Sequence, residues 1–330
     1  MKKYGKFFCL CLLLSLSIIL TACSSGGAKQ QQGTAGQEAP PYYRVVIASD
    51  VHYPSKTSES KKPQVRQEKI DNKLKAAQDI DSWKDVSLVV FTGDLVELTG
   101  SEDNYQKAKV FADKITKQKA FVLGNHEFMY GDALAANGKL QKADKHQRDK
   151  KQKLFKQTFG VKNLYYSQTM GKYLLIFLAP DMDNPTFLTE MSQQELQWLK
   201  DTLEKNKDKP TICFFHAPLA GTLDNYTAHA NKPNFIAQPR GDLDTILKAN
   251  PQIKLWVSGH THTPVTVPCF ASPVNYYAGT KILDVQNPTW DGKQVWTNSL
   301  YLYPDKIEIK TYDHKAGKFL DNFNREVPLK

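Results

Sequence analysis

Short apolar segments alternate with segments of helical periodicity along most of the chain. The apolar segments are rich in Val, Ile and Phe, which is typical of buried strands. Strands are predicted at residues 43–49, 86–92, 120–123, 164–167, 173–178, 210–215 and 253–258. Helices are predicted at residues 64–83, 102–117 and 139–159, and a fourth begins at Ser192. This alternation is typical of an α/β fold with parallel strands.

The last part of the chain has a different pattern. From Val265 onward, short apolar runs predict a region made only of strands. No internal repeat and no second linker interrupt the pattern, so we predict one α/β domain over residues 42–330.

The beginning of the chain has the pattern of an export signal. A basic start (MKKYGK) precedes an apolar stretch at residues 7–20, which is shorter than the roughly 20 residues of a membrane-spanning helix. The stretch continues into Leu-Thr-Ala-Cys at residues 20–23, which resembles the lipobox of bacterial lipoproteins. The resemblance implies cleavage before Cys23, a diacylglycerol on its sulfur, and a lipid anchor on the extracytoplasmic face of a cell membrane. A plain secretory signal with an incidental cysteine is the alternative.

Composition changes sharply after this signal. Residues 1–22 are interpreted as the signal peptide, whereas residues 23–41 are mostly Gly, Ser, Gln, Ala and Pro, which predicts a flexible tether. Cys213 and Cys269 are then the cysteines of the domain, too few for a disulfide framework.

Overall composition is that of a soluble globular domain. The 330-residue chain is 41% hydrophobic and 24% charged, with a net charge of +10 from scattered lysines. We interpret the Lys-rich segment at 139–156 as a solvated face, with contact to polyanions as the alternative. Aromatic residues are not interleaved with basic ones, and no finger spacing is present, so specific nucleic-acid binding is not expected. Nothing in the sequence predicts a protein partner.

Five predicted strands run directly into polar clusters. The clusters are Asp50-Val51-His52, Gly93-Asp94, Gly124-Asn125-His126-Glu127, His216 and Gly259-His260-Thr261-His262. Ligands of open α/β sheets collect at the carboxyl ends of strands, so we expect these clusters to meet at one place. Five of the eight histidines lie in them, and His146, His229 and His314 are assigned no role.

The side chains in these clusters offer nitrogen and oxygen donors and no thiolate. Such a set suits two divalent ions of the Mn, Fe, Zn or Ni type. Asp94 is the candidate bridge between them, through its two carboxylate oxygens. The glycines before Asp94, Asn125 and His260 allow the backbone to approach the ions closely. A single such cluster is usually an ordinary turn, but five in order point to a metal site.

The order of motifs from Asp50 to His262 resembles the calcineurin-like metallophosphoesterase family. The resemblance implies a two-sheet β-sandwich flanked by helices, in α-β-β-α layers, and a dinuclear metal hydrolase of phosphate esters. It assigns one ion to Asp50, His52 and His262, the other ion to Asn125, His216 and His260, and the bridge to Asp94. His126 matches the family's histidine that faces the phosphate and the leaving group. Glu127 is expected to support the loop or His126 rather than to bind metal.

The predicted function is therefore hydrolysis of phosphate mono- or diesters by a metal-bridging hydroxide, on a protein tethered to the membrane. His126 is the candidate catalyst, either as a proton donor to the departing alkoxide or as a stabiliser of its charge. A non-catalytic binding lipoprotein or adhesin on the same scaffold is the alternative, and a metal site that only holds the fold together is a third.

Two further features bear on the kind of phosphoesterase. Purple acid phosphatases carry a tyrosine where this chain has Glu97, so an iron–tyrosinate centre is not expected. The long polar loop at 218–240 follows the predicted ligand His216, and it either borders the substrate or is an ordinary surface loop.

Overall fold

A computed structural model describes residues 41–330 of the protein. The predicted signal peptide (1–22), the predicted lipidation at Cys23 and all but the last residue of the predicted tether lie outside the described residues. Residues Pro40–Lys330 form one compact unit. Within residues 41–330, every helix is too short or too polar to span a membrane.

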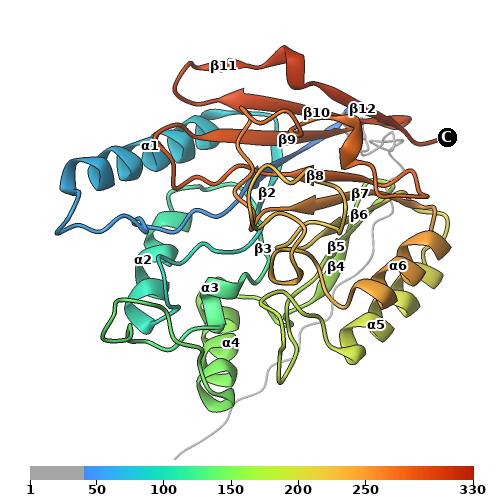
Figure 1. Ribbon diagram of the computed structural model, residues 1–330. Helices are drawn as coiled ribbons and strands as arrows, with labels where there is room; N and C mark the ends of the chain where they lie inside the picture. The colour runs from blue at the N-terminus through green and yellow to red at the C-terminus, as the bar shows by residue number, and fades with distance from the viewer. Residues whose placement is uncertain (1–40) are drawn as a thin grey trace, which may run out of the picture. The chain divides into compact units, whose positions relative to one another are not determined.

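The larger sheet joins the first part of the domain to its C-terminal end (Figure 1). In the described part of the chain it has seven strands, which are β1 (Tyr43–Ala48), β2 (Val86–Phe91), β3 (Lys119–Phe121), β9 (Trp296–Leu302), β10 (Lys306–Asp313), β11 (Lys318–Phe319) and β12 (Arg325–Pro328). The strand order is β11-β10-β9-β1-β2-β3, and β12 also pairs with β10. β1, β2 and β3 are parallel, whereas β9 pairs antiparallel with β1. The parallel strands therefore end at the same edge of the sheet.

The smaller sheet is built from the middle of the sequence. Over the described residues it has five strands, which are β4 (Tyr166–Met170), β5 (Tyr173–Phe177), β6 (Thr211–Phe214), β7 (Ile253–Ser258) and β8 (Leu283–Gln286). β5 to β8 are parallel, and β4 forms an antiparallel hairpin with β5.

Helices cover the outer faces of both sheets, so the domain has α-β-β-α layers (Figure 1). The α-helices are α1 (Pro63–Ser82), α2 (Glu102–Ala112), α3 (Asn125–Phe128), α4 (Lys145–Phe159), α5 (Gln193–Glu204) and α6 (Arg240–Ala249). The short 3-10 helices are η1 (Pro233–Phe235), η2 (Pro273–Asn275) and η3 (Asp321–Phe323). Helices α1, α2 and α4 pack on the larger sheet, and α5 and α6 pack on the smaller one. This arrangement confirms the predicted fold class.

Separate hydrophobic cores hold the layers together. Val45 of β1 belongs to the core between the sheets, with Phe214 of β6 and Val257 of β7. The alternate residues Val46 and Ala48 belong to the core beneath α1 and α2. Because both faces of β1 are covered, the strand is apolar along nearly its whole length and shows no alternation with polar residues.

Two predicted helices have wrong boundaries. The helix predicted at 102–117 extends too far, because Ile115 is turned into the core and α2 ends before it. The helix predicted at 139–159 begins too early. Asp144 accepts a hydrogen bond from the amide of Gln147 and caps α4 at its true start.

The prediction of strands alone from Val265 onward is wrong for residues 265–282. This segment contains η2 and no strand, and its apolar residues Phe270 and Ile282 are buried within loops. Asn275 is fully buried and donates two hydrogen bonds to loop carbonyl oxygens. A buried loop needs such side-chain donors because no neighbouring strand satisfies its backbone.

Candidate metal centre

The seven side chains predicted as metal ligands lie at the carboxyl ends of strands from both sheets. They follow β1 (Asp50, His52), β2 (Asp94), β3 (Asn125), β6 (His216) and β7 (His260, His262). The two sheets thus bring together residues that are more than 200 positions apart in the sequence, such as His52 and His262.

One cluster consists of Asp50, His52, Asp94 and His262. The Nε2 atom of His262 lies 3.2 Å from Oδ1 of Asp50 and 3.3 Å from Nε2 of His52. Nε2 of His52 lies 3.8 Å from Oδ2 of Asp94. Asp50, His52 and Asp94 are buried, whereas the side chain of His262 is 33% exposed, so this cluster opens to solvent on the His262 side.

The other cluster consists of Asp94, His216 and His260, with Asn125 beside them. Nε2 of His216 lies 3.0 Å from Oδ1 of Asn125, 3.1 Å from Nδ1 of His260 and 3.2 Å from Oδ2 of Asp94. Asp94 therefore belongs to both clusters, as a bridging ligand must.

The carboxylate of Asp94 is oriented differently from the sequence-based expectation of a bridge through both oxygens. Oδ2 is the oxygen that faces both His52 and His216. Oδ1 accepts a hydrogen bond of 2.8 Å from the backbone amide of His126. Oδ2 is therefore the Asp94 oxygen that lies nearest to the histidines of both clusters.

Hydrogen bonds to the backbone fix the orientation of the histidine rings. Nδ1 of His52, Nδ1 of His216 and Nε2 of His260 donate to the carbonyl oxygens of Val96, Thr92 and Asn234, respectively. In the neutral form of each ring, which is the form that binds metal, the other nitrogen therefore presents a lone pair to the cluster. The amide nitrogen of Asn125 donates to the hydroxyl of Tyr130, which turns Oδ1 of Asn125 toward His216.

These clusters fit divalent ions. Donor atoms that bind one ion at about 2.1 Å lie about 3.0–3.4 Å from one another, which matches most of the separations given above. If the ring of His216 is neutral, the atoms of this cluster that point at one another are all acceptors, so the cluster needs either a proton or a metal ion between them. A nitrogen and oxygen donor set without thiolate suits borderline divalent ions.

The electrostatics of the site also favour positive charge at its centre. Burial alone would lower the pKa of His216, but the Asp94 and Asp50 carboxylates raise it to about 9. Burial alone would raise the pKa of Asp94, but His216 and its neighbours hold it well below the usual range. A proton on His216 thus places one positive charge at the centre of the site, where a divalent metal ion would place two.

The backbone is strained at most of the predicted ligands. Left-handed conformations occur at Asp50 (φ 49°), His52 (φ 46°), Asp94 (φ 53°), His260 (φ 64°) and His262 (φ 53°). Non-glycine residues rarely adopt this conformation, and each instance costs about 1–3 kcal/mol. Such strain persists where surrounding contacts impose it, and it is concentrated at functional sites.

Glycines make room for the ligands. Gly93 has φ 95°, and a Cβ there would lie 2.5 Å from Nδ1 of His216. A Cβ on Gly259 would overlap the side chains of Ser49 and Asp50. The close approach expected from the sequence is therefore present on both sides of the site.

Glu127 supports the loops, as predicted. Its fully buried carboxylate accepts hydrogen bonds of 2.7–3.1 Å from the backbone amides of Asp94, Leu95, Val96 and Gly124. It thereby ties the loop after β2 to the loop after β3. The side chain is outside both candidate metal clusters and stabilises the backbone that carries their residues.

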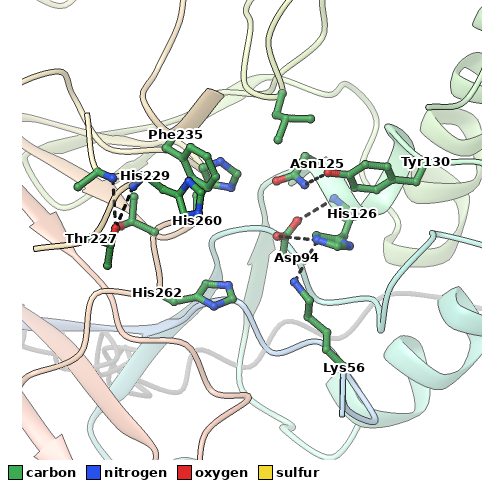
Figure 2. Close-up of a pocket in the computed structure, with 13 residues that line it drawn as sticks. Lys56, Asp94, Asn125, His126, Tyr130, Thr227, His229, Phe235, His260 and His262 are labelled. Atoms are coloured by element: carbon green, nitrogen blue, oxygen red, sulfur yellow. Dashed lines mark hydrogen bonds and ion pairs between the residues drawn. The ribbon is translucent and has the colours of Figure 1, made fainter. Parts of the chain in front are cut away.

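A pocket of about 300 Å³ opens above the two clusters (Figure 2). The loop at 218–240 forms one wall of it through Thr227, His229 and Phe235, so this loop borders the site. The ring of Phe235 stacks on His260 at 5.3 Å and on His229 at 4.9 Å. His229 therefore lines the pocket, although the sequence pattern assigned it no role.

His126 lies on the opposite wall. Its Nδ1 donates to the carbonyl oxygen of Leu98, so Nε2 is the atom that faces the pocket, 4.0 Å from Oδ2 of Asp94. The ammonium group of Lys56 lies 3.2 Å from this Nε2 and donates to it. Burial lowers the pKa of His126 to about 4, so the free ring is neutral at pH 7.

Lys56 and Tyr130 are site residues that the motif analysis missed. Neither belongs to a polar cluster at a strand end, and the only sequence signal for Lys56 is its place in the loop that follows His52. Glu97, in contrast, pairs with Arg66 at 2.7 Å and lies outside the pocket lining.

Comparisons with known proteins concern the family and the fold. The model of a family described as calcineurin-like phosphoesterase matches residues 43–264. The chain is similar in structure to a dimetal phosphatase from Danio rerio, with a TM-score of 0.58 and 13% identity over 88% of this chain and 100% of that chain. It is also similar to purple acid phosphatase PPD1 from yellow lupin (Lupinus luteus) seeds, with a TM-score of 0.55 and 13% identity over 84% of this chain and 52% of that chain. Likeness at such identities shows a shared fold. No curated protein matches the chain significantly.

Proposed function

The chain belongs to the calcineurin-like phosphoesterase family, and from this premise we propose that it hydrolyses phosphate esters with the side chains gathered around Asp94. Members of the family use two divalent metal ions, and the protein is a metallophosphoesterase. The observation that carries the proposal is the pair of donor clusters that share one buried carboxylate.

The ligand roles follow from the two clusters. Asp50, His52 and His262 would hold one ion, whereas Asn125, His216 and His260 would hold the other, and Asp94 would be shared by both. When bound, two such ions neutralise charge on the phosphate and make hydroxide available near neutral pH. The buried loops fixed by Glu127 hold the ligands in place before substrate arrives, which reduces reorganisation during the reaction.

His126 acts on the leaving-group side of the phosphate. Its Nε2 faces the pocket, and its orientation is fixed by the bond from Nδ1 to the carbonyl oxygen of Leu98. A proton on Nε2 can pass to the departing alkoxide or form a hydrogen bond to it. The negative charge of a bound phosphate favours that proton. His126→Ala is therefore expected to slow alkyl phosphates more than p-nitrophenyl phosphate, whose leaving group needs less stabilisation.

The test is hydrolysis of p-nitrophenyl phosphate and bis-p-nitrophenyl phosphate by the protein loaded with Mn²⁺, Fe²⁺ or Zn²⁺. Asp94→Asn is expected to lower kcat at least about 100-fold and to reduce bound metal. Asp208→Asn, which changes an exposed carboxylate far from the pocket lining, is the control and is expected to have no effect. Absence of turnover with every ion would refute a hydrolase and favour a metal-dependent binding protein.

We also propose that the protein is anchored to the outer face of a bacterial membrane through a lipid on Cys23. The support is the sequence of residues 1–23, with its basic start, apolar stretch and lipobox-like end. Labelled fatty acid is expected to be incorporated into the protein in the producing cells. Cys23→Ser is expected to abolish that incorporation, and equal labelling of both proteins would contradict the proposal.

A further inference from the structure

Lys56 places a positive charge in the wall of the pocket. Its Nζ lies 3.2 Å from Nε2 of His126, and both side chains line the pocket (Figure 2). Within residues 41–330, this side chain makes no ion pair with a carboxylate. Among the 13 residues that line the pocket, Lys56 and Asp94 are those with a formal charge, and Asp94 is assigned to the metal ions.

The backbone beneath Lys56 is held from distant parts of the fold. Asp291 accepts hydrogen bonds from the amide of Lys56 at 3.2 Å and from the hydroxyl of Ser55 at 2.6 Å. Lys73 is fully buried, pairs with Asp291 at 2.7 Å and donates to the carbonyl oxygen of Pro54. The loop that presents Lys56 is therefore fixed, although the side chain itself is exposed to the pocket.

The two classes of phosphate ester differ at the place that Lys56 faces. A monoester has three terminal oxygens and carries a charge of about −1.5 to −2 at pH 7, whereas a diester has two terminal oxygens and a single charge. If each bound metal ion contacted one terminal oxygen, the third oxygen of a monoester would need another donor. In a diester, an uncharged ester group occupies that position and gains nothing from an ammonium group.

We propose that Lys56 binds the third terminal oxygen of the substrate phosphate and makes the enzyme prefer phosphomonoesters to phosphodiesters. This inference rests on the proposed hydrolysis of phosphate esters at the same site. His126 and Lys56 then divide the work: His126 faces the leaving group, and Lys56 faces the oxygen that remains on phosphorus.

The experiment compares kcat/KM for p-nitrophenyl phosphate and bis-p-nitrophenyl phosphate in the Mn²⁺-loaded full chain. Lys56→Met is expected to lower kcat/KM for the monoester about 10- to 30-fold, which is the usual contribution of one charged hydrogen bond. For the diester, which offers no third charged oxygen, kcat/KM is expected to fall less than about 3-fold. Lys56→Arg keeps the charge and is expected to restore most of the preference. Lys61→Met is the matched control, because Lys61 lies exposed on the same loop and outside the pocket lining.

Binding of inorganic phosphate provides a readout that does not depend on turnover. By titration calorimetry, Lys56→Met with normal metal content is expected to bind phosphate about tenfold more weakly than the wild type. Turnover of neither ester by the wild type would overturn the proposed function and this inference with it. If the wild type is active but Lys56→Met lowers both esters equally, or leaves both rates and the phosphate affinity unchanged, the role of Lys56 alone is refuted.

Discussion

Replacement of Asp291 by alanine is expected to destabilise the domain strongly, although Asp291 binds no metal. Its carboxylate pairs with Lys73 at 2.7 Å, and the side chain of Lys73 is 0% exposed. Burial lowers the pKa of Lys73 to about 8, and the Asp291 carboxylate opposes that shift. Asp291 is therefore what makes a buried ammonium group tolerable in this position.

The size of the effect follows from these contacts. Loss of one partner of a buried ion pair costs about 3–5 kcal/mol, because the remaining charge is left without compensation. Ser55 and the amide of Lys56 also lose an acceptor, at about 1 kcal/mol each, but water that enters from the slightly exposed side of Asp291 offsets part of this. We therefore expect a total of about 4–6 kcal/mol, a large share of the typical 5–15 kcal/mol of a domain.

Urea unfolding followed by circular dichroism measures this loss. Lys69→Met is the matched control, because Lys69 reaches the same carboxylate from the solvent side at 3.4 Å, and its loss is expected to cost less than about 1 kcal/mol. The double variant Lys73→Met/Asp291→Leu is expected to recover most of the stability, since it removes both charges. A loss below about 1 kcal/mol in Asp291→Ala, or no recovery in the double variant, would refute this reasoning.

Three further predictions concern the site. Glu127→Gln removes the charge and one of the two oxygens that accept from the four backbone amides. The free energy of unfolding is expected to fall by about 2–4 kcal/mol, measured as a lower melting temperature. An unchanged melting curve would contradict this role. Gly259→Ala forces a Cβ into Asp50, so elemental analysis is expected to find less Mn²⁺ per chain, and full occupancy would disprove the steric argument. Chelation is expected to lower the melting temperature reversibly, because ligands bound at 1,000 times Kd stabilise by about 4 kcal/mol; identical curves with and without metal would show that the clusters hold none.

Much of the fold and of the family could be predicted because each depends on local pattern. The strand at 43–49 is apolar because it is covered on both faces, and the polar clusters follow such strands directly. The family match confirms the resemblance inferred from those clusters. Residues 265–282 could not be predicted in this way, because their apolar side chains are buried in loops that hydrogen-bond through Asn275 rather than through a ladder.

The parts of the site that the sequence did not reveal depend on distant contacts. Lys56 is one lysine among many, and it is distinguished only by the loop that Asp291 and Lys73 hold in place. Tyr130 is identified only by its bond to the amide of Asn125. The orientation of the Asp94 carboxylate likewise depends on the backbone amide of His126, which no spacing of residues predicts.

The segment after the family match is an integral part of the site. The match ends at residue 264, yet two later residues hold the end of β1. The hydroxyl of Thr289 donates to the carbonyl oxygen of Asp50 at 2.8 Å. The amide of Trp290 donates to the carbonyl oxygen of Ser49 at 3.1 Å. On the other side, the amide of Asp50 donates to the carbonyl oxygen of Gly93. The left-handed conformation of Asp50 is thus imposed from two directions, and one of them comes from 239 residues further along the chain. The geometry of the first cluster therefore depends on the segment between β8 and β9, which the family match does not include.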